Sequence, residues 1–216
     1  MNNVKTIFFD FDGVVVDSEP LHAKAKKLVL DKLSIQYDNN IFDQYKGLTD
    51  KAFFDAISNS LGVHNHSSKE LLDMKNLFFE RLLNELKLVD GFLIFNEKIR
   101  NKGIKTALVS STSLYSFKLI DEIYHIVNLF DLVITGADTD KHKPHPDPYL
   151  KALKILQVNP NNTVVIEDYP NGIISAKKAG CFVYGIIGSF SSEILIESGA
   201  DEIVESYEEL ENIIGV

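Results

Sequence analysis

Short, nearly continuous hydrophobic runs alternate with longer amphipathic segments along most of the chain. Because apolar side chains occupy successive positions in each run, these runs are typical of strands buried on both faces of a sheet. They lie at residues 5–9, 104–109, 132–134, 163–166, 182–187 and, more weakly, 202–204. Amphipathic patterns predict helices over residues 148–156, 171–178 and 191–199. This alternation predicts an α/β fold in which a parallel sheet is sandwiched by helices.

The interval between the first two expected strands is too long for a single crossover helix. Residues 17–90 contain no convincing strand, and helical patterns fill most of them, at 21–33, 51–61 and 69–86. A connection of this length needs secondary structure of its own. We therefore expect an inserted all-helical domain of residues 17–88, and a core domain of residues 1–16 and 89–216.

Composition and charge narrow the class of protein. Of the 216 residues, 45% are hydrophobic, and 22 Lys and Arg stand against 31 Asp and Glu, which gives a formal net charge of −9. A negative field of this size repels nucleic acids and anionic lipids, so we expect neither as a partner. The single cysteine, Cys181, lies in an apolar run and is expected to be a buried thiol. No apolar stretch approaches the ~20 residues of a membrane span, and the N-terminus lacks a signal-peptide pattern, so we expect a cytoplasmic protein. A monomer is the default expectation for its oligomeric state.

Acidic residues directly follow two of the expected strands. Asp10 and Asp12 come after the first strand, and Glu167 and Asp168 come after another. Acids beside Gly13 could simply form a turn. In parallel sheets, however, the carboxyl ends of the strands meet at one edge, so these four carboxylates should converge there. Carboxylates at a buried edge repel one another unless a cation joins them, and oxygen-rich clusters of this kind suit Mg²⁺.

Two further segments at strand ends carry groups that can bind phosphate. Lys143 lies in a loop with three prolines, which stiffen the loop and fix the direction of its side chain. Most lysines are simply solvated, but a fixed positive charge is needed here beside several acids and a phosphate. Ser110 ends another strand and is followed by Ser111, Thr112 and Ser113. We expect one hydroxyl of this stretch to cap a helix, while Ser110 and nearby backbone N–H groups bind phosphate oxygens.

Taken together, these residues resemble the haloacid dehalogenase superfamily, in particular its β-phosphoglucomutase-like phosphatase branch with a helical cap. The matching motifs run in the family's order across nearly the whole chain, at Asp10–Glu19, Val109–Ser111, Lys143–Asp147, Ile166–Ile173 and Ala176–Gly180. Each motif alone is weak, but the ordered set is specific. The resemblance implies a Rossmann-like core with an inserted helical cap. It also implies a Mg²⁺-dependent phosphatase whose substrate is a small phosphorylated metabolite, with sugar phosphates the favoured class.

By position, the resemblance gives each core residue a role. Asp10 corresponds to the nucleophile that forms an aspartyl-phosphate, and Asp12 corresponds to the general acid and base. Ser110, Ser111 and Lys143 correspond to the phosphate-binding groups, and Lys143 also holds the nucleophile. The expected metal ligands are Asp10, the backbone carbonyl of Asp12, Asp168 and, directly or through water, Glu167. These roles come from the resemblance, and the residue chemistry agrees with them.

Substrate specificity is expected to lie in the inserted domain. His22, Lys46 and Lys51 are the candidates to face the substrate. Mutases of the family place an arginine in this domain that grips the second phosphate of a bisphosphate, whereas this chain has Asp50 at the aligned position. Because an acid there weakens bisphosphate binding, a phosphatase is favoured over the alternative, a β-phosphoglucomutase-type mutase. A non-catalytic binding protein on the same scaffold is a further alternative, which the presence of the core catalytic residues argues against.

Overall fold

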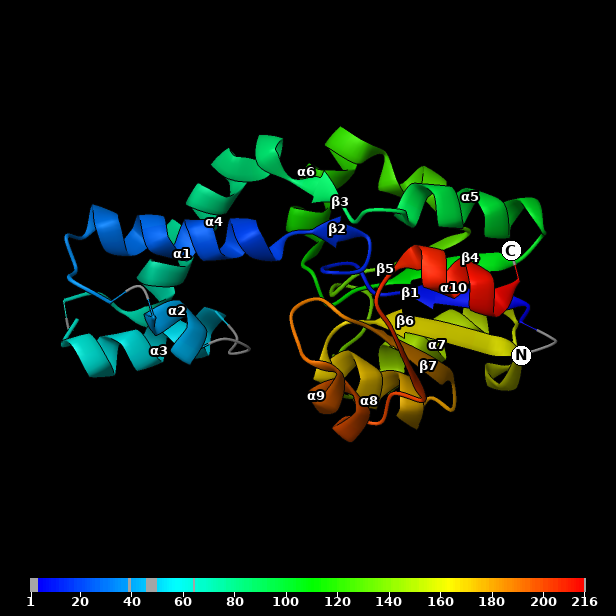
Figure 1. Ribbon diagram of the computed structural model, residues 1–216. Coiled ribbons are helices and arrows are strands. Elements are labelled where there is room, and N and C mark those ends of the chain that lie inside the picture. The colour runs from blue at the N-terminus through cyan, green and yellow to red at the C-terminus, as the bar shows by residue number, and fades with distance from the viewer. Residues whose placement is uncertain (1–3, 39, 46–49, 64, 216) are drawn as a thin grey trace. The chain divides into compact units, whose positions relative to one another are not determined.

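The computed structural model describes residues 4–38, 40–45, 50–63 and 65–215. The chain divides into two compact units. The core unit consists of Met1–Asp17 and Lys87–Val216, and the helical unit consists of Ser18–Leu86. In Figure 1 the helical unit holds the helices drawn in blue to cyan, and the core unit holds the sheet.

A six-stranded sheet forms the centre of the core unit. Its strands are β1 (Thr6–Phe9), β4 (Lys105–Val109), β5 (Leu132–Ile134), β6 (Thr163–Glu167), β7 (Phe182–Ile186) and β8 (Glu202–Val204). They pair in the order β5-β4-β1-β6-β7-β8, and every pair is parallel. Phe9 lies opposite both Leu108 and Ile166, so β1, β4 and β6 end at the same edge of the sheet. The six strands predicted from the hydrophobic runs, and the α/β fold class, are confirmed.

Helices cover both faces of this sheet. Neighbouring residues of a strand point to opposite faces, and because both sets are apolar in a strand such as β1, both faces need cover. The helices of the core unit are α5 (Phe92–Asn101), α6 (Leu114–Tyr124), α7 (Asp147–Leu156), α8 (Pro170–Lys178), α9 (Ser192–Glu197) and α10 (Tyr207–Ile214), with 3₁₀ turns η2 (Ile126–Leu129) and η3 (Pro160–Asn162). On one side of β1, the Phe9 ring packs edge-on against Phe92 of α5, with centroids 5.7 Å apart. On the other side, the Phe8 ring stacks on Tyr149 of α7 at 6.4 Å. Both faces of the sheet are therefore buried beneath helices.

Two short strands lie where the chain leaves and re-enters the core unit. They are β2 (Val16–Asp17) and β3 (Lys87–Leu88), and they pair antiparallel. The expectation of no strand within residues 17–90 is therefore wrong at both ends of that interval. Strands of two residues are too short to produce an alternating pattern, so the sequence carries no periodic signal for them.

The helical unit contains only helices and turns among its described residues. Its elements are α1 (Glu19–Lys32), α2 (Ile41–Gln44), α3 (Asp50–Leu61), α4 (Ser68–Leu82) and the 3₁₀ turn η1 (Leu83–Glu85). Val29 of α1, Phe54 of α3 and Leu71 of α4 are completely buried in a shared hydrophobic cluster. Helix α4 begins with a capping box, in which Ser67 and Glu70 each accept a hydrogen bond from the other's backbone N–H. The unit therefore has a hydrophobic core of its own.

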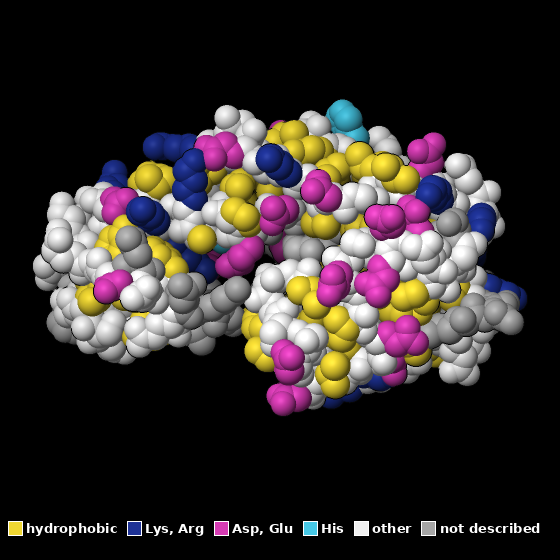
Figure 2. All heavy atoms as spheres, viewed as in Figure 1, with side chains coloured by type: hydrophobic (Ala, Val, Ile, Leu, Met, Phe, Trp, Pro, Cys, Tyr) yellow, Lys and Arg dark blue, Asp and Glu magenta, His cyan; other side chains and the backbone are white. Residues whose placement is uncertain are grey.

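Both acidic and large hydrophobic side chains are exposed on the surface of the described residues. On the face shown in Figure 2, acidic side chains are scattered over both units rather than gathered into one patch. Cys181 is buried, as expected. None of the helices in the described part of the chain has the length and the apolar character that a membrane crossing requires.

Candidate active site

The carboxyl ends of three neighbouring strands bring most of the expected core residues together. Asp10 directly follows β1, and its backbone N–H donates to the carbonyl of Ile166 at 3.0 Å. Glu167 is the last residue of β6, and Asp168 follows it. Ser110 follows β4 in the same way. Because these strands are parallel and in register, all four residues lie at one edge of the sheet.

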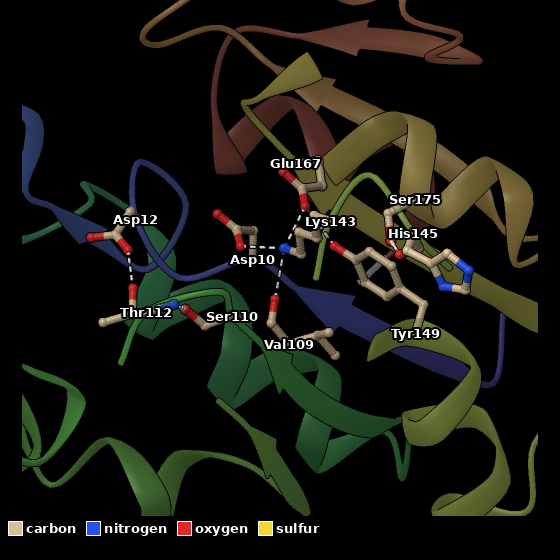
Figure 3. Close-up of polar contacts among 10 residues, drawn as sticks. All are labelled: Asp10, Asp12, Val109, Ser110, Thr112, Lys143, His145, Tyr149, Glu167 and Ser175. Carbon is tan, nitrogen blue, oxygen red and sulfur yellow. Dashed lines mark hydrogen bonds and ion pairs between the residues drawn. The ribbon is translucent and has the colours of Figure 1, made fainter. Parts of the chain in front are cut away.

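Lys143, in the loop before α7, supplies a fixed positive charge at this edge. Its Nζ lies 2.5 Å from Asp10 Oδ1, 2.7 Å from Glu167 Oε1 and 2.8 Å from the carbonyl oxygen of Val109 (Figure 3). An ammonium group has three N–H donors, so these three acceptors satisfy it. Burial acts to lower the pKa of this ammonium, but the attraction of Asp10 and Glu167 outweighs burial and raises the pKa above its ordinary value. Lys143 therefore stays charged, and its side chain is held in one direction.

The carboxylates around Lys143 are short of positive charge. Burial, together with the neighbouring charge of Glu167, raises the pKa of Asp10 to about 7 even though Lys143 acts in the opposite direction. Burial and the charges of Asp10 and Glu167 also raise the pKa of Asp168 well above its ordinary value. One ammonium group is thus not enough to stabilise all of these carboxylates in their ionised form.

Two observations test whether this cluster fits a divalent cation. Asp10, Glu167 and Asp168 can each offer one oxygen such that the three oxygens lie within 4.8 Å of one another. In addition, Oε2 of Glu167 is buried and has no hydrogen-bond partner among the described residues. Carboxylate oxygens are the ligands that Mg²⁺ and Ca²⁺ prefer. The cluster therefore fits a divalent metal in both its donor atoms and its charge.

Two glycines make room for these carboxylates. A Cβ atom at Gly13 would lie 2.0 Å from Oδ2 of Asp168, and Gly13 also has a left-handed backbone, with φ of 76°. A Cβ atom at Gly172, in the first turn of α8, would lie 1.8 Å from Oε1 of Glu167. Any side chain at either position would collide with a carboxylate of the cluster. The backbone of the loop after β1 and that of α8 therefore form part of the wall of the site.

Asp12 lies beside the serine-rich segment that follows β4. Its Oδ2 accepts a hydrogen bond of 2.5 Å from Oγ1 of Thr112 (Figure 3). The backbone N–H of Thr112 donates to Oγ of Ser110 at 2.9 Å. Ser110 is buried, whereas Ser111 is exposed. Ser113 caps α6, which confirms that one hydroxyl of this stretch is a helix cap.

Two residues of this site are not among those that the sequence pattern predicts. Thr112 is one of them, and its place directly after two serines at a strand end was a usable signal. Tyr149 is the other: its hydroxyl donates to Oε1 of Glu167 at 2.6 Å, and Lys143 Nζ lies 5.0 Å from the centre of its ring. In the sequence, Tyr149 is one apolar position of an amphipathic helix, and nothing there distinguishes it from a core residue.

Two of the three expected substrate-facing residues, His22 and Lys51, have a partner within the helical unit. Nδ1 of His22 lies 2.7 Å from Nζ of Lys75. Lys51 is exposed, and its Nζ pairs with Asp55 at 2.8 Å. Lys46 lies outside the described residues. Both of these contacts lie within the helical unit, and a role of His22 or Lys51 toward substrate stays a prediction.

Asp50, at the start of α3, is held by two ammonium groups. Its carboxylate oxygens lie 2.7 Å from Lys75 Nζ and 3.1 Å from Lys26 Nζ. Burial acts to raise the pKa of Asp50, but Lys75 and Lys26 outweigh it and hold that pKa below its ordinary value. Asp50 is therefore an ionised partner of two lysines in the folded chain.

Comparison with known proteins places this site in a family. The family model for haloacid dehalogenase-like hydrolases matches residues 7–186. A phosphorylated carbohydrates phosphatase of Thermotoga maritima is 29% identical over 220 residues, which cover 98% of this chain and 98% of that protein. The beta-phosphoglucomutase of Bacillus subtilis is 29% identical over 190 residues, which cover 85% of this chain and 83% of that protein. A crystal structure of a Thermotoga maritima protein matches with a TM-score of 0.85 and 28% identity, over 98% of both chains. Because the family model spans most of its length, this chain belongs to the haloacid dehalogenase-like hydrolase family.

Proposed function

We propose that this enzyme, a hydrolase of phosphate esters, is a Mg²⁺-dependent phosphatase of small phosphorylated metabolites that works through an aspartyl-phosphate. The setting of Asp10 is the observation that supports this most. Its carboxylate is held by Lys143 at 2.5 Å and can share a cation with Glu167 and Asp168. A carboxylate can attack a phosphate dianion only where nearby positive charge offsets the repulsion between the two anions. Asp10 has that environment.

The first half-reaction moves the phosphoryl group to Asp10. Because Lys143 occupies Oδ1 of Asp10, Oδ2 is the oxygen that attacks phosphorus. The bond between phosphorus and the leaving oxygen breaks, and Asp12 gives its proton to that oxygen. A divalent cation, when bound by the carboxylates of Asp10 and Asp168 and the backbone carbonyl of Asp12, supplies positive charge that offsets the repulsion between the carboxylates and the phosphate.

The second half-reaction releases inorganic phosphate. Asp12, now a carboxylate, takes a proton from a water molecule, and the water oxygen attacks phosphorus. The bond between phosphorus and Asp10 breaks, which restores the free Asp10 carboxylate and the protonated Asp12. One group can therefore serve as acid in the first half and as base in the second.

The segment after β4 is suited to hold the phosphoryl oxygens. Oγ of Ser110 accepts a hydrogen bond from the backbone N–H of Thr112, so its own proton is free to be donated to phosphate. We expect Ser110 and Lys143 to bind the phosphoryl group, with Ser111 contributing through its backbone N–H. The Ser111 side chain is exposed, which makes its hydroxyl the less important of the two.

We favour sugar phosphates as the substrate class. We also propose that the enzyme is cytoplasmic and acts as a monomer. The similarity to a phosphorylated carbohydrates phosphatase supports this class, and the similarity to a beta-phosphoglucomutase supports the alternative, a sugar-phosphate mutase. Asp50 argues against the mutase. Its carboxylate takes up charge of Lys26 and Lys75 that could otherwise attract the second phosphate of a bisphosphate.

Phosphate release from a panel of sugar phosphates, with Mg²⁺ and with a chelator, tests the proposal. We expect metal-dependent release that is lost in the Asp10→Asn variant, because the amide oxygen is a poor nucleophile. β-Glucose 1-phosphate with a trace of the bisphosphate belongs in the same panel. Isomerisation to glucose 6-phosphate without release of phosphate would identify a mutase instead. Turnover by Asp10→Asn close to that of the wild type would refute the role of Asp10.

A further inference from the structure

The backbone of Thr112 is held from two sides. Its N–H donates to Oγ of Ser110 at 2.9 Å, and its carbonyl accepts from the N–H of Gly136 at 2.9 Å. A Cβ atom at Gly136 would lie 2.6 Å from the carbonyl oxygen of Ser111 and 3.1 Å from that of Thr112. The approach of these two loops therefore requires glycine at position 136. Thr112 is thus fixed between the end of β4 and the end of β5.

The hydroxyl of Thr112 donates a hydrogen bond to Asp12. Its Oγ1 lies 2.5 Å from Oδ2 of Asp12, a length typical of a hydrogen bond to a charged oxygen (Figure 3). A carboxylate has no proton to give, so the threonine hydroxyl is the donor in this bond. The β-branched side chain of threonine also has few rotamers. Thr112 therefore holds one oxygen of Asp12 in a defined direction.

This bond fixes the direction of the Asp12 carboxyl group, because the backbone of Thr112, which carries the hydroxyl, is itself held by Ser110 and Gly136. We propose that Thr112 is a positioning residue, which orients the Asp12 carboxyl group for proton transfer to the leaving oxygen. The inference rests on the proposed role of Asp12 as general acid and base.

Leaving groups of different basicity separate this role from a structural one. A phenolate leaves with difficulty unless it receives a proton, whereas 4-nitrophenolate leaves readily without one. The value of kcat/KM reports the first half-reaction, in which Asp12 acts as acid. For Thr112→Val we therefore expect kcat/KM to fall about tenfold to hundredfold with phenyl phosphate, the range set by one hydrogen bond to a charged group. With 4-nitrophenyl phosphate we expect a fall of less than about threefold.

Matched variants complete the experiment. Thr112→Ser keeps the hydroxyl and should restore both rates, while Asp12→Ala should show the same difference between the two esters in larger form. Thr163→Val is the control, because the Thr163 hydroxyl donates to the carbonyl of Asn159 at the opposite end of β6. It should leave the ratio of the two rates unchanged. Thr112→Ala offers a second deletion of the hydroxyl if the valine variant does not fold.

Different outcomes would overturn the positioning role of Thr112, the acid–base role of Asp12 and the proposed function. Equal losses with both esters in folded Thr112→Val, or no loss with either, would overturn the positioning role. An active wild type whose Asp12→Ala variant does not discriminate between the esters would refute the role of Asp12, and the inference with it. If the wild type releases phosphate from neither ester nor from the sugar phosphate panel, the proposed function itself fails.

Discussion

Gly13 offers a direct test of whether the loop after β1 shapes the candidate metal site. In the variant Gly13→Ala, the new Cβ atom would lie 2.0 Å from Oδ2 of Asp168. Real Cβ atoms essentially never lie within 3.0 Å of such a neighbour, so the carboxylate must move by about 1 Å or the loop must shift. Gly13 also has φ of 76°, where alanine is less stable than glycine by about 1–2 kcal/mol. The variant therefore combines backbone strain with displacement of a proposed metal ligand.

Gly103 separates these two effects. It has φ of 73°, and a Cβ atom there would meet nothing within 4 Å. Gly103→Ala should therefore lose about 1–2 kcal/mol of unfolding free energy from backbone strain alone and keep its activity. Gly13→Ala should lose at least as much stability. Because a misplacement of about 1 Å can reduce a rate by about 100-fold, we expect its turnover to fall by that order and its Mg²⁺ requirement to rise.

The assay compares the wild type and the two variants in two measurements. Urea unfolding in chelator gives the free energy of unfolding, and phosphate release from 4-nitrophenyl phosphate across a series of Mg²⁺ concentrations gives turnover and metal requirement. If Gly13→Ala matched Gly103→Ala in turnover and in its dependence on Mg²⁺, the collision with Asp168 would be of no consequence. The reasoning that Gly13 is required by the metal site would then be wrong.

Three further predictions follow from charges in the structure. Lys143→Met leaves the buried carboxylates of Asp10 and Glu167 without their ammonium partner, so urea unfolding in chelator should show a loss of about 3–5 kcal/mol, and phosphate release should be abolished. Saturating Mg²⁺ at about 100 times its dissociation constant should stabilise the wild type by about 2.7 kcal/mol, and an unchanged melting temperature would argue against the metal site. Folding lowers the pKa of Asp50, so its ion pairs with Lys75 and Lys26 contribute to the free energy of unfolding at pH values above the unfolded pKa of about 4. This contribution is lost as the pH falls through the folded pKa. Asp50→Asn should therefore lose less stability than the wild type as the pH falls, and an equal loss in both proteins would contradict this account.

The parts of the fold that could be predicted are those in which burial restricts which residue types can occupy each position. Strands such as β1 and β6 are covered on both faces, so they need apolar side chains at successive positions, and this leaves a clear pattern. The pair β2 and β3 is held by backbone hydrogen bonds over two residues each, which leaves no pattern. Helix α4 ends at Leu82, before the predicted 86, because the apolar positions continue through the 3₁₀ turn η1.

The same distinction applies to the site. Asp10 and Glu167 could be predicted because an acid next to a buried strand is unusual and requires a partner. Tyr149 could not, because its ring serves the hydrophobic core while its hydroxyl binds Glu167, and only the ring leaves a mark on helix periodicity. Thr112 lies between these cases: hydroxyl residues commonly cap helices, and the neighbouring Ser113 does so. Which hydroxyl caps and which binds Asp12 depends on the backbone path after β4, and residue spacing does not give that path.

Charge balance connects the proposed metal with the proposed acid. Asp10, Asp12, Glu167 and Asp168 carry four negative charges when ionised, and Lys143 carries one positive charge, which leaves −3. A divalent cation reduces this to −1, and a proton on Asp12 brings it to zero. A phosphate dianion would therefore meet the least repulsion when Asp12 is protonated, which is the state that the first half-reaction needs. When the leaving group takes that proton, Asp12 becomes a carboxylate, but Asp10 loses its negative charge by forming the aspartyl-phosphate, so the sum over these groups and the cation would stay at zero. Asp12 can then accept the proton of the water that attacks phosphorus, and the Asp10 carboxylate is restored as inorganic phosphate is formed.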